Sequence, residues 1–244
     1  MFDVFLTSLL ASLGAFKFLV LMAFVFVTFS TVTYKFMSDQ VMIKHLRDEM
    51  KKLQEQMKKS KDDQKKMMDI NKKLMSLNGQ IFSHSWKSNM LPGLLFAFLI
   101  LPWLHANLAY APLQQDVPFN VTVVFDNYKG LAELSVPSGM INLDSVKKNV
   151  SSDGVWYVSG KEGKYLVSLK VNGKEYFKDV TISNLIYAKP VQVVNDGVVK
   201  EIRLPQEKRV VLPVSVFGWN GWFATYFYAS ILFSIIIRKL LRVY

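Results

Sequence analysis

Two stretches without Asp, Glu, Lys or Arg decide the fold: residues 90–111 read MLPGLLFAFLILPWLHANLAYA, and residues 216–237 read VFGWNGWFATYFYASILFSIII. Each has 22 residues, and about 20 helical residues cross the apolar core of a bilayer. A third apolar block runs from about Val4 to Tyr34, interrupted by Lys17 and small polar residues. The three blocks predict an α-helical membrane protein with three transmembrane helices.

The first block is longer than one crossing requires. Gly14 is expected to separate a short interfacial helix from the span itself, which we place near Ala15–Phe36. A cleaved signal peptide would begin with a basic segment, whereas the residues before Lys17 include Asp3 and no Lys or Arg. We therefore interpret the block as a permanent span.

Composition excludes several kinds of site. The 244 residues include no Cys and only three His, with 51% apolar residues and a net charge of +11. Without Cys there is no disulfide framework, thiolate zinc site, iron–sulfur cluster or Cys nucleophile. No phosphate-binding loop or nucleophile–base pair is visible either, so we expect no metal, no cofactor and no enzymatic activity.

Basic residues set the expected orientation, because cytoplasmic flanks of spans are enriched in Lys and Arg. Residues 35–88 carry 13 basic and 7 acidic side chains, the tail 238–244 carries three basic ones, and residues 112–215 carry 13 basic and 11 acidic. The pattern predicts a multi-pass plasma-membrane protein with the N-terminus and residues 112–215 outside. The expected parts are 1–36 (N-terminal segment and first span), 37–88 (cytoplasmic hairpin), 89–111 (second span), 112–215 (external domain), 216–237 (third span) and 238–244 (basic tail).

The cytoplasmic segment has a heptad seam that reverses. Apolar residues recur in steps of three and four from Ile43 to Met57, the pattern fails at residues 60–64, and it resumes from Met67 to Ile81. The two runs mirror each other about residue 62, so Leu53 would face Ile70. A mirrored seam predicts an antiparallel coiled-coil hairpin with its turn at residues 60–63.

The hairpin's outer faces are basic, and three interpretations stay open. The lysines form a solvated helix face, a contact with ribosomal RNA near the nascent-chain exit, or a contact with anionic lipid headgroups. The candidate contact residues are Lys51, Lys52, Lys58, Lys59, Lys61, Lys65 and Lys66.

From Pro118 the pattern changes to period two with β-branched and aromatic residues, which is typical of strands. Asn172-Gly173 and Asn195-Asp196-Gly197 are hairpin-turn signals. Seven predicted strands (119–125, 131–136, 154–159, 164–171, 174–182, 191–194 and 198–204) indicate an extracytoplasmic all-β insertion domain of immunoglobulin-like type. Asn120 and Asn149 begin glycosylation sequons, and two such matches are also expected by chance.

Hydroxyl side chains gather in the inner halves of the first and third spans. Facing each other, they would line a hydrated groove, although Ser and Thr in spans often bond to their own helix. Lys17 either lies shallow and reaches the outer headgroups or lies deeper and faces protein or water. The candidate groove residues are Lys17, Thr28, Ser30, Thr31, Thr33, Ser230 and Ser234.

The order of span, basic hairpin and two further spans resembles the YidC/Oxa/Get insertase superfamily, most closely its archaeal three-span branch, kin to the third subunit of the endoplasmic-reticulum membrane complex. Two stretches carry the resemblance. One is the Met-rich run Met67–Met75 leading through Trp86 to Pro92. The other is Gly218–Trp222, followed by Ser230, Ser234 and Arg238-Lys239-Leu240-Leu241. The β domain lies outside the resemblance.

The resemblance implies a membrane-protein insertase or chaperone that moves short polar segments through the groove and releases apolar helices into lipid without nucleotide hydrolysis. Its implied partners are the bilayer, nascent membrane-protein clients, the ribosome and other membrane subunits. Two alternatives remain: a membrane-anchored scaffold linking a cytoplasmic partner to an external one, and a subunit of an ion channel or transporter.

Overall fold

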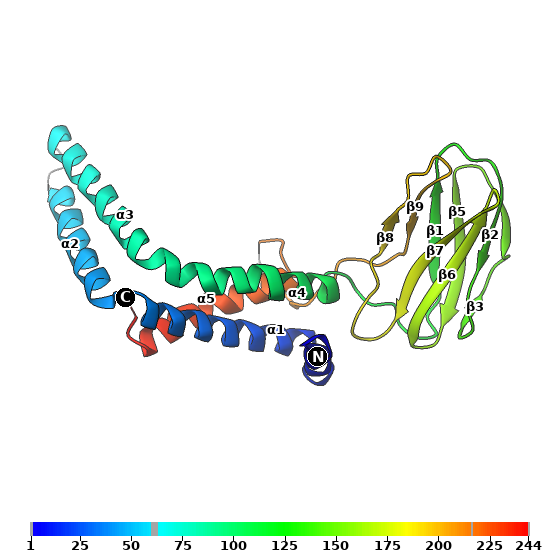
Figure 1. Ribbon diagram of the computed structural model, residues 1–244, viewed down its shortest axis with the longest axis horizontal. Helices are drawn as coiled ribbons and strands as arrows, with labels where there is room; N and C mark the ends of the chain where they lie inside the picture. The colour runs from blue at the N-terminus through cyan, green and yellow to red at the C-terminus, as the bar shows by residue number, and fades with distance from the viewer. Residues whose placement is uncertain (1, 60–62, 216, 244) are drawn as a thin grey trace. The chain divides into compact units, whose positions relative to one another are not determined.

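The computed structural model describes residues 2–59, 63–215 and 217–243 (Figure 1). It contains three long apolar helices and two antiparallel β-sheets, as the sequence predicted. The chain divides into two compact units. One comprises Met1–Phe18 and Trp103–Ala224, and the other comprises Leu19–Pro102 and Thr225–Tyr244.

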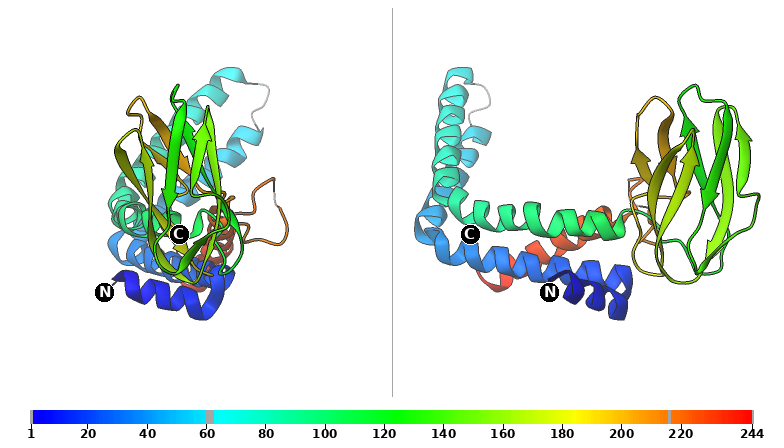
Figure 2. Two further views of the ribbon diagram at one scale, coloured as in Figure 1. Left: turned by 90° about the vertical axis from the view of Figure 1, so that its right-hand side faces the viewer. Right: turned by 45° about the vertical axis from the view of Figure 1, so that its right-hand side comes forward.

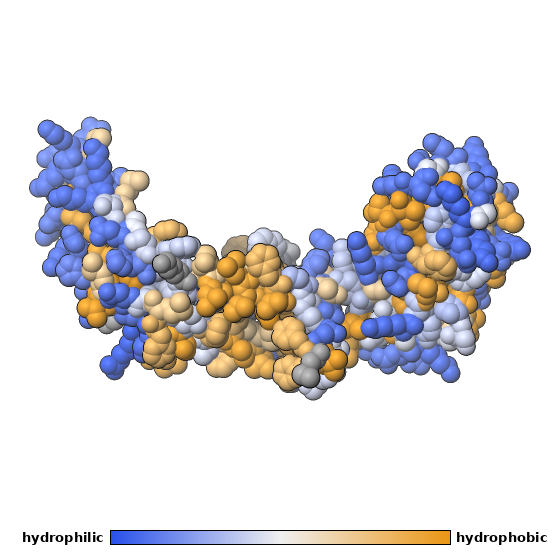
Figure 3. All heavy atoms as spheres, in the orientation of Figure 1, coloured by the Kyte–Doolittle hydropathy of each residue, from blue (hydrophilic) through white to orange (hydrophobic). Residues whose placement is uncertain are grey.

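Within the described residues, three helical stretches are long and apolar enough to cross a membrane: Phe2–Met37, Ser88–Leu108 and Trp222–Leu240. The first is helix α1 (Phe2–Met37) and the third is α5 (Trp222–Leu240). The second combines the end of α3 (Gln64–Leu95) with a π-helical turn, η1 (Phe96–Ile100), and α4 (Leu101–Leu108). In Figure 3, hydrophobic side chains gather over these helices.

Helix α1 is interrupted at Gly14, as predicted. Gly14 has φ 73° and ψ 165°, a conformation that only glycine adopts at little cost. The short segment before it buries Leu6 and Leu10, so it has an apolar face of its own. The break therefore separates a packed N-terminal helix from the stretch that is long enough to span.

The second stretch widens just before a proline. The Leu101 N–H bonds to the Phe96 carbonyl, five residues earlier. Pro102 follows directly; it has no N–H, and its ring crowds the carbonyl four residues before it. The π-type turn accommodates that missing bond and crowding.

Helix α5 begins at Trp222, later than the apolar block at residues 216–237 led us to expect. Phe217 and Gly218 have φ of 51° and 78°, a left-handed backbone that cannot continue into an α-helix. Val216 lies outside the described residues. The helix runs on to Leu240, so Arg238 of the predicted tail belongs to its last turn.

Aromatic rings join the apolar helices of the second unit. Phe26 of α1 lies 4.7 Å from the ring of Phe96 in η1, which stacks on Tyr226 of α5 at 4.8 Å. Phe24 and Phe233 meet edge to face at 5.3 Å. These ring contacts connect α1, η1 and α5 within the second unit.

The predicted hairpin corresponds to α2 (Gln40–Lys59) and the first part of α3, which run side by side (Figures 1 and 2). Carboxylates of Asp39 and Asp63 cap the two helices by accepting the backbone N–H of Met42 and of Lys66. Residues 60–62, including the predicted turn and Lys61, lie outside the described residues.

The predicted seam is confirmed by burial. Its ten members are buried or half-buried, and every other described residue between 41 and 81 is exposed. The seam consists of Ile43, Leu46, Met50, Leu53, Met57, Met67, Ile70, Leu74, Leu77 and Ile81.

The β domain has nine strands in the described residues: β1 (Phe119–Phe125), β2 (Gly130–Ser135), β3 (Met140–Asn142), β4 (Lys147–Val150), β5 (Asp153–Gly160), β6 (Gly163–Val171), β7 (Lys174–Ile182), β8 (Val191–Val193) and β9 (Val199–Arg203). The seven predicted strands are confirmed to within about a residue. Sequence reasoning missed β3 and β4, which are short and lack a clear alternation.

The immunoglobulin-like prediction is corrected by the strand order. The sheets run β3-β5-β1-β9-β8 and β4-β2-β6-β7. In an immunoglobulin domain the first two strands share a sheet, whereas here β1 pairs with β5 and β9 while β2 pairs with β4 and β6. A count of strands predicts a sandwich but does not fix how its strands connect.

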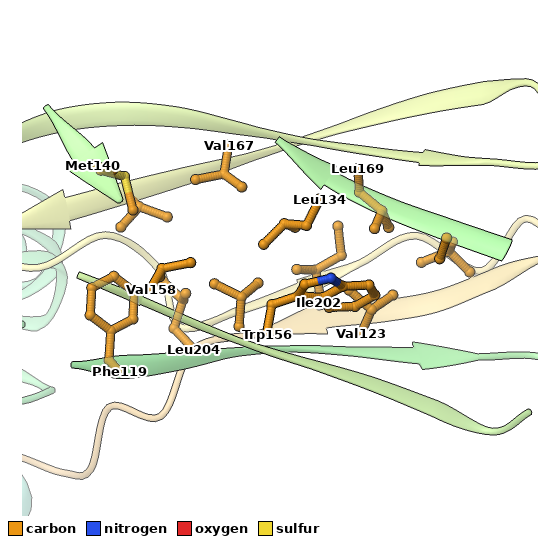
Figure 4. Close-up of a cluster of buried hydrophobic side chains, with 14 of the residues drawn as sticks. Phe119, Val123, Leu134, Met140, Trp156, Val158, Val167, Leu169, Ile202 and Leu204 are labelled. Carbon is orange, nitrogen blue, oxygen red and sulfur yellow. The ribbon is translucent and has the colours of Figure 1, made fainter. Parts of the chain in front are cut away.

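Both sheets contribute side chains to one core (Figure 4). Trp156 of β5 is fully buried, and its indole N–H donates to the Val146 carbonyl at 3.1 Å. Val121 of β1 and Leu169 of β6 also lie in this core. The domain thus has an apolar core of its own.

Two adjacent residues of α3, one in the seam and one outside it, allow a test of whether the seam stabilises the hairpin. Leu74 is 8% exposed, whereas the adjacent Met75 is 70% exposed. Leu74→Ala should cost about 2 kcal/mol through the cavity it leaves, while Met75→Ala should cost almost nothing. Limited trypsin digestion of the detergent-solubilised protein should then cleave within residues 40–81 about thirtyfold faster in the first variant, because each ~1.4 kcal/mol lost raises the open fraction tenfold. Equal cleavage of both variants would contradict the seam.

Candidate functional site

Helices α1, α3 and α5 of the second unit enclose a cavity of about 350 Å³. Its wall is partly apolar, with Phe26, Val27 and Ile231 among the lining residues. The remaining wall is polar although it belongs to apolar helices. The polar lining residues are Ser30, Thr31, Tyr34, Asn89, Ser230, Ser234 and Arg238.

Four of the seven predicted groove residues line this cavity: Ser30 and Thr31 from α1, and Ser230 and Ser234 from α5. Thr31 is buried, and the other three are half-buried. Ser230 and Ser234 are four residues apart and so lie on one face of α5, whereas Ser30 and Thr31 are consecutive residues of α1 that both reach the cavity. The structure therefore brings the inner hydroxyls of both helices together.

The other three predicted groove residues do not line the cavity. Thr28 and Thr33 are half-buried in α1 but lie outside the cavity wall. The Thr28 hydroxyl oxygen is buried and has no hydrogen-bond partner among the described residues. Lys17 is exposed and belongs to the other unit.

Sequence reasoning missed three lining residues. From the sequence, Arg238 contributes to the predicted orientation and to the family resemblance but not to the predicted groove, yet its guanidinium lies 5.6 Å from the ring centroid of the buried Tyr34, within the range of a cation–π contact. Asn89 stands at the boundary predicted between hairpin and second span. The available signal was the one-turn spacing from Ser230 through Ser234 to Arg238, which puts all three on one face of α5.

Hydrogen bonding distinguishes the cavity hydroxyls from others in the same unit. Ser85 and Ser88 donate to carbonyls of their own helix, both at 2.7 Å. Among described residues, Ser30, Thr31 and Ser234 make no such bond. Their hydroxyls are therefore available to water or to a polar group that enters the cavity.

The cavity's chemistry is that of a neutral to cationic binding surface. No carboxylate is among the described residues that line it, and Arg238 is its one charged group. Searching the described residues for three or more clustered His, Cys, Asp or Glu side chains finds no group that could hold a metal ion. The wall can donate and accept hydrogen bonds and attract negative charge.

The candidate contact lysines of the hairpin lie on its solvent side. Lys51, Lys52, Lys58, Lys59, Lys65 and Lys66 are all exposed. Lys51 lies 3.8 Å from Asp48, with both side chains more than half exposed, so this ion pair contributes little to stability. The hairpin thus presents a basic surface next to an apolar seam.

The two sequons lie in strands. Asn120 in β1 is half-buried and pairs with Tyr157 of β5, while Asn149 in the edge strand β4 is exposed. Of the two, Asn149 is the more accessible to modification.

Comparison of the chain with known proteins gives no match to a protein-family model, a curated protein or a solved structure. The functional argument therefore rests on the residues themselves.

Labelling tests whether the cavity holds water. The chain has no native Cys, so single substitutions report directly. In nanodiscs open on both faces, Ser234→Cys should react with a water-soluble maleimide at least about tenfold faster than Ile236→Cys, since the reactive thiolate needs water. Ile236 is two residues away, 43% exposed and outside the cavity wall. Equally slow reaction at both positions would mean that the cavity is dry.

Proposed function

We propose that this protein is a membrane-protein insertase or chaperone of the YidC-like type. The observation that carries the proposal is the cavity of about 350 Å³ in which Ser30, Thr31, Ser230 and Ser234 meet between apolar helices. Such a cavity is costly for a protein that only needs an anchor, because polar groups in lipid require partners.

The energetics suit transfer of a short polar segment. Moving a peptide or hydroxyl group from water into hydrocarbon without a partner costs several kcal/mol. A hydrated cavity reaching partway into the bilayer shortens the apolar distance, and its hydroxyls replace part of the lost hydration. Burial of the client's own apolar helix in lipid supplies the free energy, at about 25 cal/mol per Å² of apolar surface, so no nucleotide hydrolysis is needed.

Arg238 should make the cavity prefer acidic client segments over basic ones. A guanidinium beside Tyr34 attracts a carboxylate or a carbonyl oxygen, and its planar fork can hold either in a bidentate manner. A client segment that carries a few acidic residues would enter more readily than a basic one.

The proposed topology follows from charge. The excess of Lys and Arg in residues 35–88 and at Arg238, Lys239 and Arg242 supports a cytoplasmic location for the hairpin and the C-terminus. With three crossings, the N-terminus and the β-sandwich lie outside the plasma membrane. The cavity residues, which adjoin the hairpin along α1 and α3, then open towards the cytoplasmic side, where clients arrive.

The resemblance to the archaeal three-span branch of the YidC/Oxa/Get superfamily supports the same function. It rests on the Met-rich run at residues 67–75 and on the serines and Arg-Lys-Leu-Leu ending of α5. Met side chains repack around different apolar partners, which suits a surface that meets many clients.

The proposal is tested by removing the cavity hydroxyls. The combined variant Ser30→Ala, Thr31→Val, Ser230→Ala and Ser234→Ala should reduce insertion of a client with a short polar external segment by about fivefold or more, since one hydrogen bond is worth about 1 kcal/mol. Insertion would be measured by protection of that segment from protease in proteoliposomes. Ser83→Ala and Ser85→Ala serve as controls, because those hydroxyls bond to their own helix.

Crosslinking separates the insertase from the scaffold alternative. A photoreactive residue at Ser230 should capture a nascent client, whereas one at the lipid-exposed Leu232 (57% exposed) should not. Crosslinks confined to the hairpin and the β domain, with unchanged insertion by the hydroxyl variant, would favour a scaffold.

The basic hairpin supports a second element of the proposal, docking to the ribosome. Lys58, Lys59, Lys65 and Lys66 lie near its tip and are exposed, and phosphate contacts are salt-dependent. Charge reversal of all four to Glu should abolish salt-sensitive co-sedimentation with ribosomes, and the Lys→Arg variant at the same positions should retain it. Loss of binding to anionic vesicles alone, with ribosome binding intact, would identify a lipid contact instead.

A further inference from the structure

A second polar region of the molecule has no role in the insertase proposal. In the first unit, two adjoining cavities of about 330 and 420 Å³ share His105 and Tyr110 in their walls. One lies against the start of α5, and the other lies against the loop before β8. Because both cavities have these two side chains in their walls, we refer to them together as the interfacial recess.

The interfacial recess is strongly cationic. Lys208 and Arg209 line the first cavity and Lys189 lines the second, whereas no carboxylate is among the described lining residues. Lys189 and Lys208 are exposed, so their ammonium groups are available. Residues 112–215 as a whole carry 13 basic and 11 acidic side chains, and the three cations of the recess account for more than this small excess.

Hydrogen bonds connect the chain segments that form the recess. Backbone bonds join Ala111 to Glu207 at 2.8 Å and Arg209 to Ala109 at 3.0 Å, so the chain leaving α4 pairs with the chain that leads to α5. The Arg209 guanidinium donates to the Leu185 carbonyl at 2.7 Å, and its partial burial lowers its pKa from the usual value. The Tyr187 hydroxyl donates to the His105 carbonyl at 2.5 Å.

Aromatic side chains place the recess at the level of lipid headgroups. Trp222 is the first residue of α5 and lies edge to face with His105 at 6.1 Å. Trp219 is 55% exposed just before it, and Tyr110 follows the end of α4 at Leu108. Trp and Tyr gather where an apolar span meets the headgroup region. The recess therefore lies at the ends of two apolar helices.

We propose that the interfacial recess binds the headgroup of an anionic phospholipid, with the phosphate held by Lys189, Lys208 and Arg209 and the acyl chains lying along the apolar helices that begin and end there. Three cations without a carboxylate complement a phosphate, and the tryptophans contact the glycerol and upper chain region. A soluble anion would gain nothing from the apolar helix ends, which favours a lipid. The inference does not depend on the insertase proposal, because it concerns a different cavity and a different readout.

The test uses the full-length protein in nanodiscs with equal amounts of phosphatidylglycerol and phosphatidylcholine of matched chains. Native mass spectrometry after release should find phosphatidylglycerol retained about tenfold over phosphatidylcholine. Each Lys near the surface contributes about 1 kcal/mol of attraction to anionic lipid, so Lys189→Gln with Lys208→Gln should bring retention of the two lipids close to equal. Arg209 is left intact because its bond to Leu185 is one of those that connect these chain segments.

The matched control removes two other exposed lysines of the same domain, Lys161→Gln with Lys200→Gln, and should keep the preference. Equal retention of both lipids by the unmodified protein would overturn the proposal, as would an undiminished preference in the Lys189 and Lys208 variant. Loss of phosphatidylglycerol on adding excess inorganic phosphate, but not chloride of matched ionic strength, would identify a site for soluble anions instead. The unmodified protein alone decides the lipid preference even if the double variant fails to fold.

Discussion

The second unit is built from helices apolar enough to span a membrane, and one constraint governs such helices: in lipid, their polar groups must find partners without help from the hydrophobic effect. Aromatic contacts hold the helices together, with Phe96 of η1 between Phe26 and Tyr226. Phe26 takes part in these ring contacts and also lines the cavity. The hydroxyls of Ser30, Thr31, Ser230 and Ser234 line the same cavity, whereas Leu232 and Ile236 of α5 are exposed and lie outside its wall.

The same constraint explains why the hairpin and the helices differ in their cores. In water, the seam of α2 and α3 is buried by the hydrophobic effect, and Ile43, Ile70 and Leu74 suffice to hold it. Past the hairpin, α3 continues into the second apolar stretch, where Pro92 and the π-turn before Pro102 interrupt a regular helix. The first part of α3 therefore buries apolar side chains in the hairpin seam, whereas its later part contributes a polar side chain, Asn89, to the cavity.

Sequence predicted those features that local chemistry determines. Gly14 breaks α1 because of its backbone freedom, the seam follows from heptad spacing, and β7 follows from alternation and its Asn-Gly turn. The start of α5 was missed because apolarity does not reveal the left-handed turn at Phe217 and Gly218. Strand order and the participation of Tyr34 and Asn89 in the cavity depend on contacts between distant segments, which no local pattern encodes. Thr28 and Thr33 were grouped with Ser30 and Thr31 by composition, although only some faces of a helix can line one cavity.

The wall of the cavity carries several hydroxyl groups and only one charge among its described residues, and this bears on the proposed insertase mechanism. A neutral hydrogen bond is worth about 1 kcal/mol net in a protein, whereas a buried ion pair loses several kcal/mol when one partner leaves. A wall of Ser and Thr can therefore replace part of a segment's hydration and still let the segment go. The single cation, Arg238, also interacts with the face of Tyr34. It can therefore attract an acidic or carbonyl group of the segment without binding it tightly. Under the proposed insertase function, a cavity that accepts and then releases a polar segment is expected to make weak, exchangeable contacts of this kind, unlike a permanent binding site.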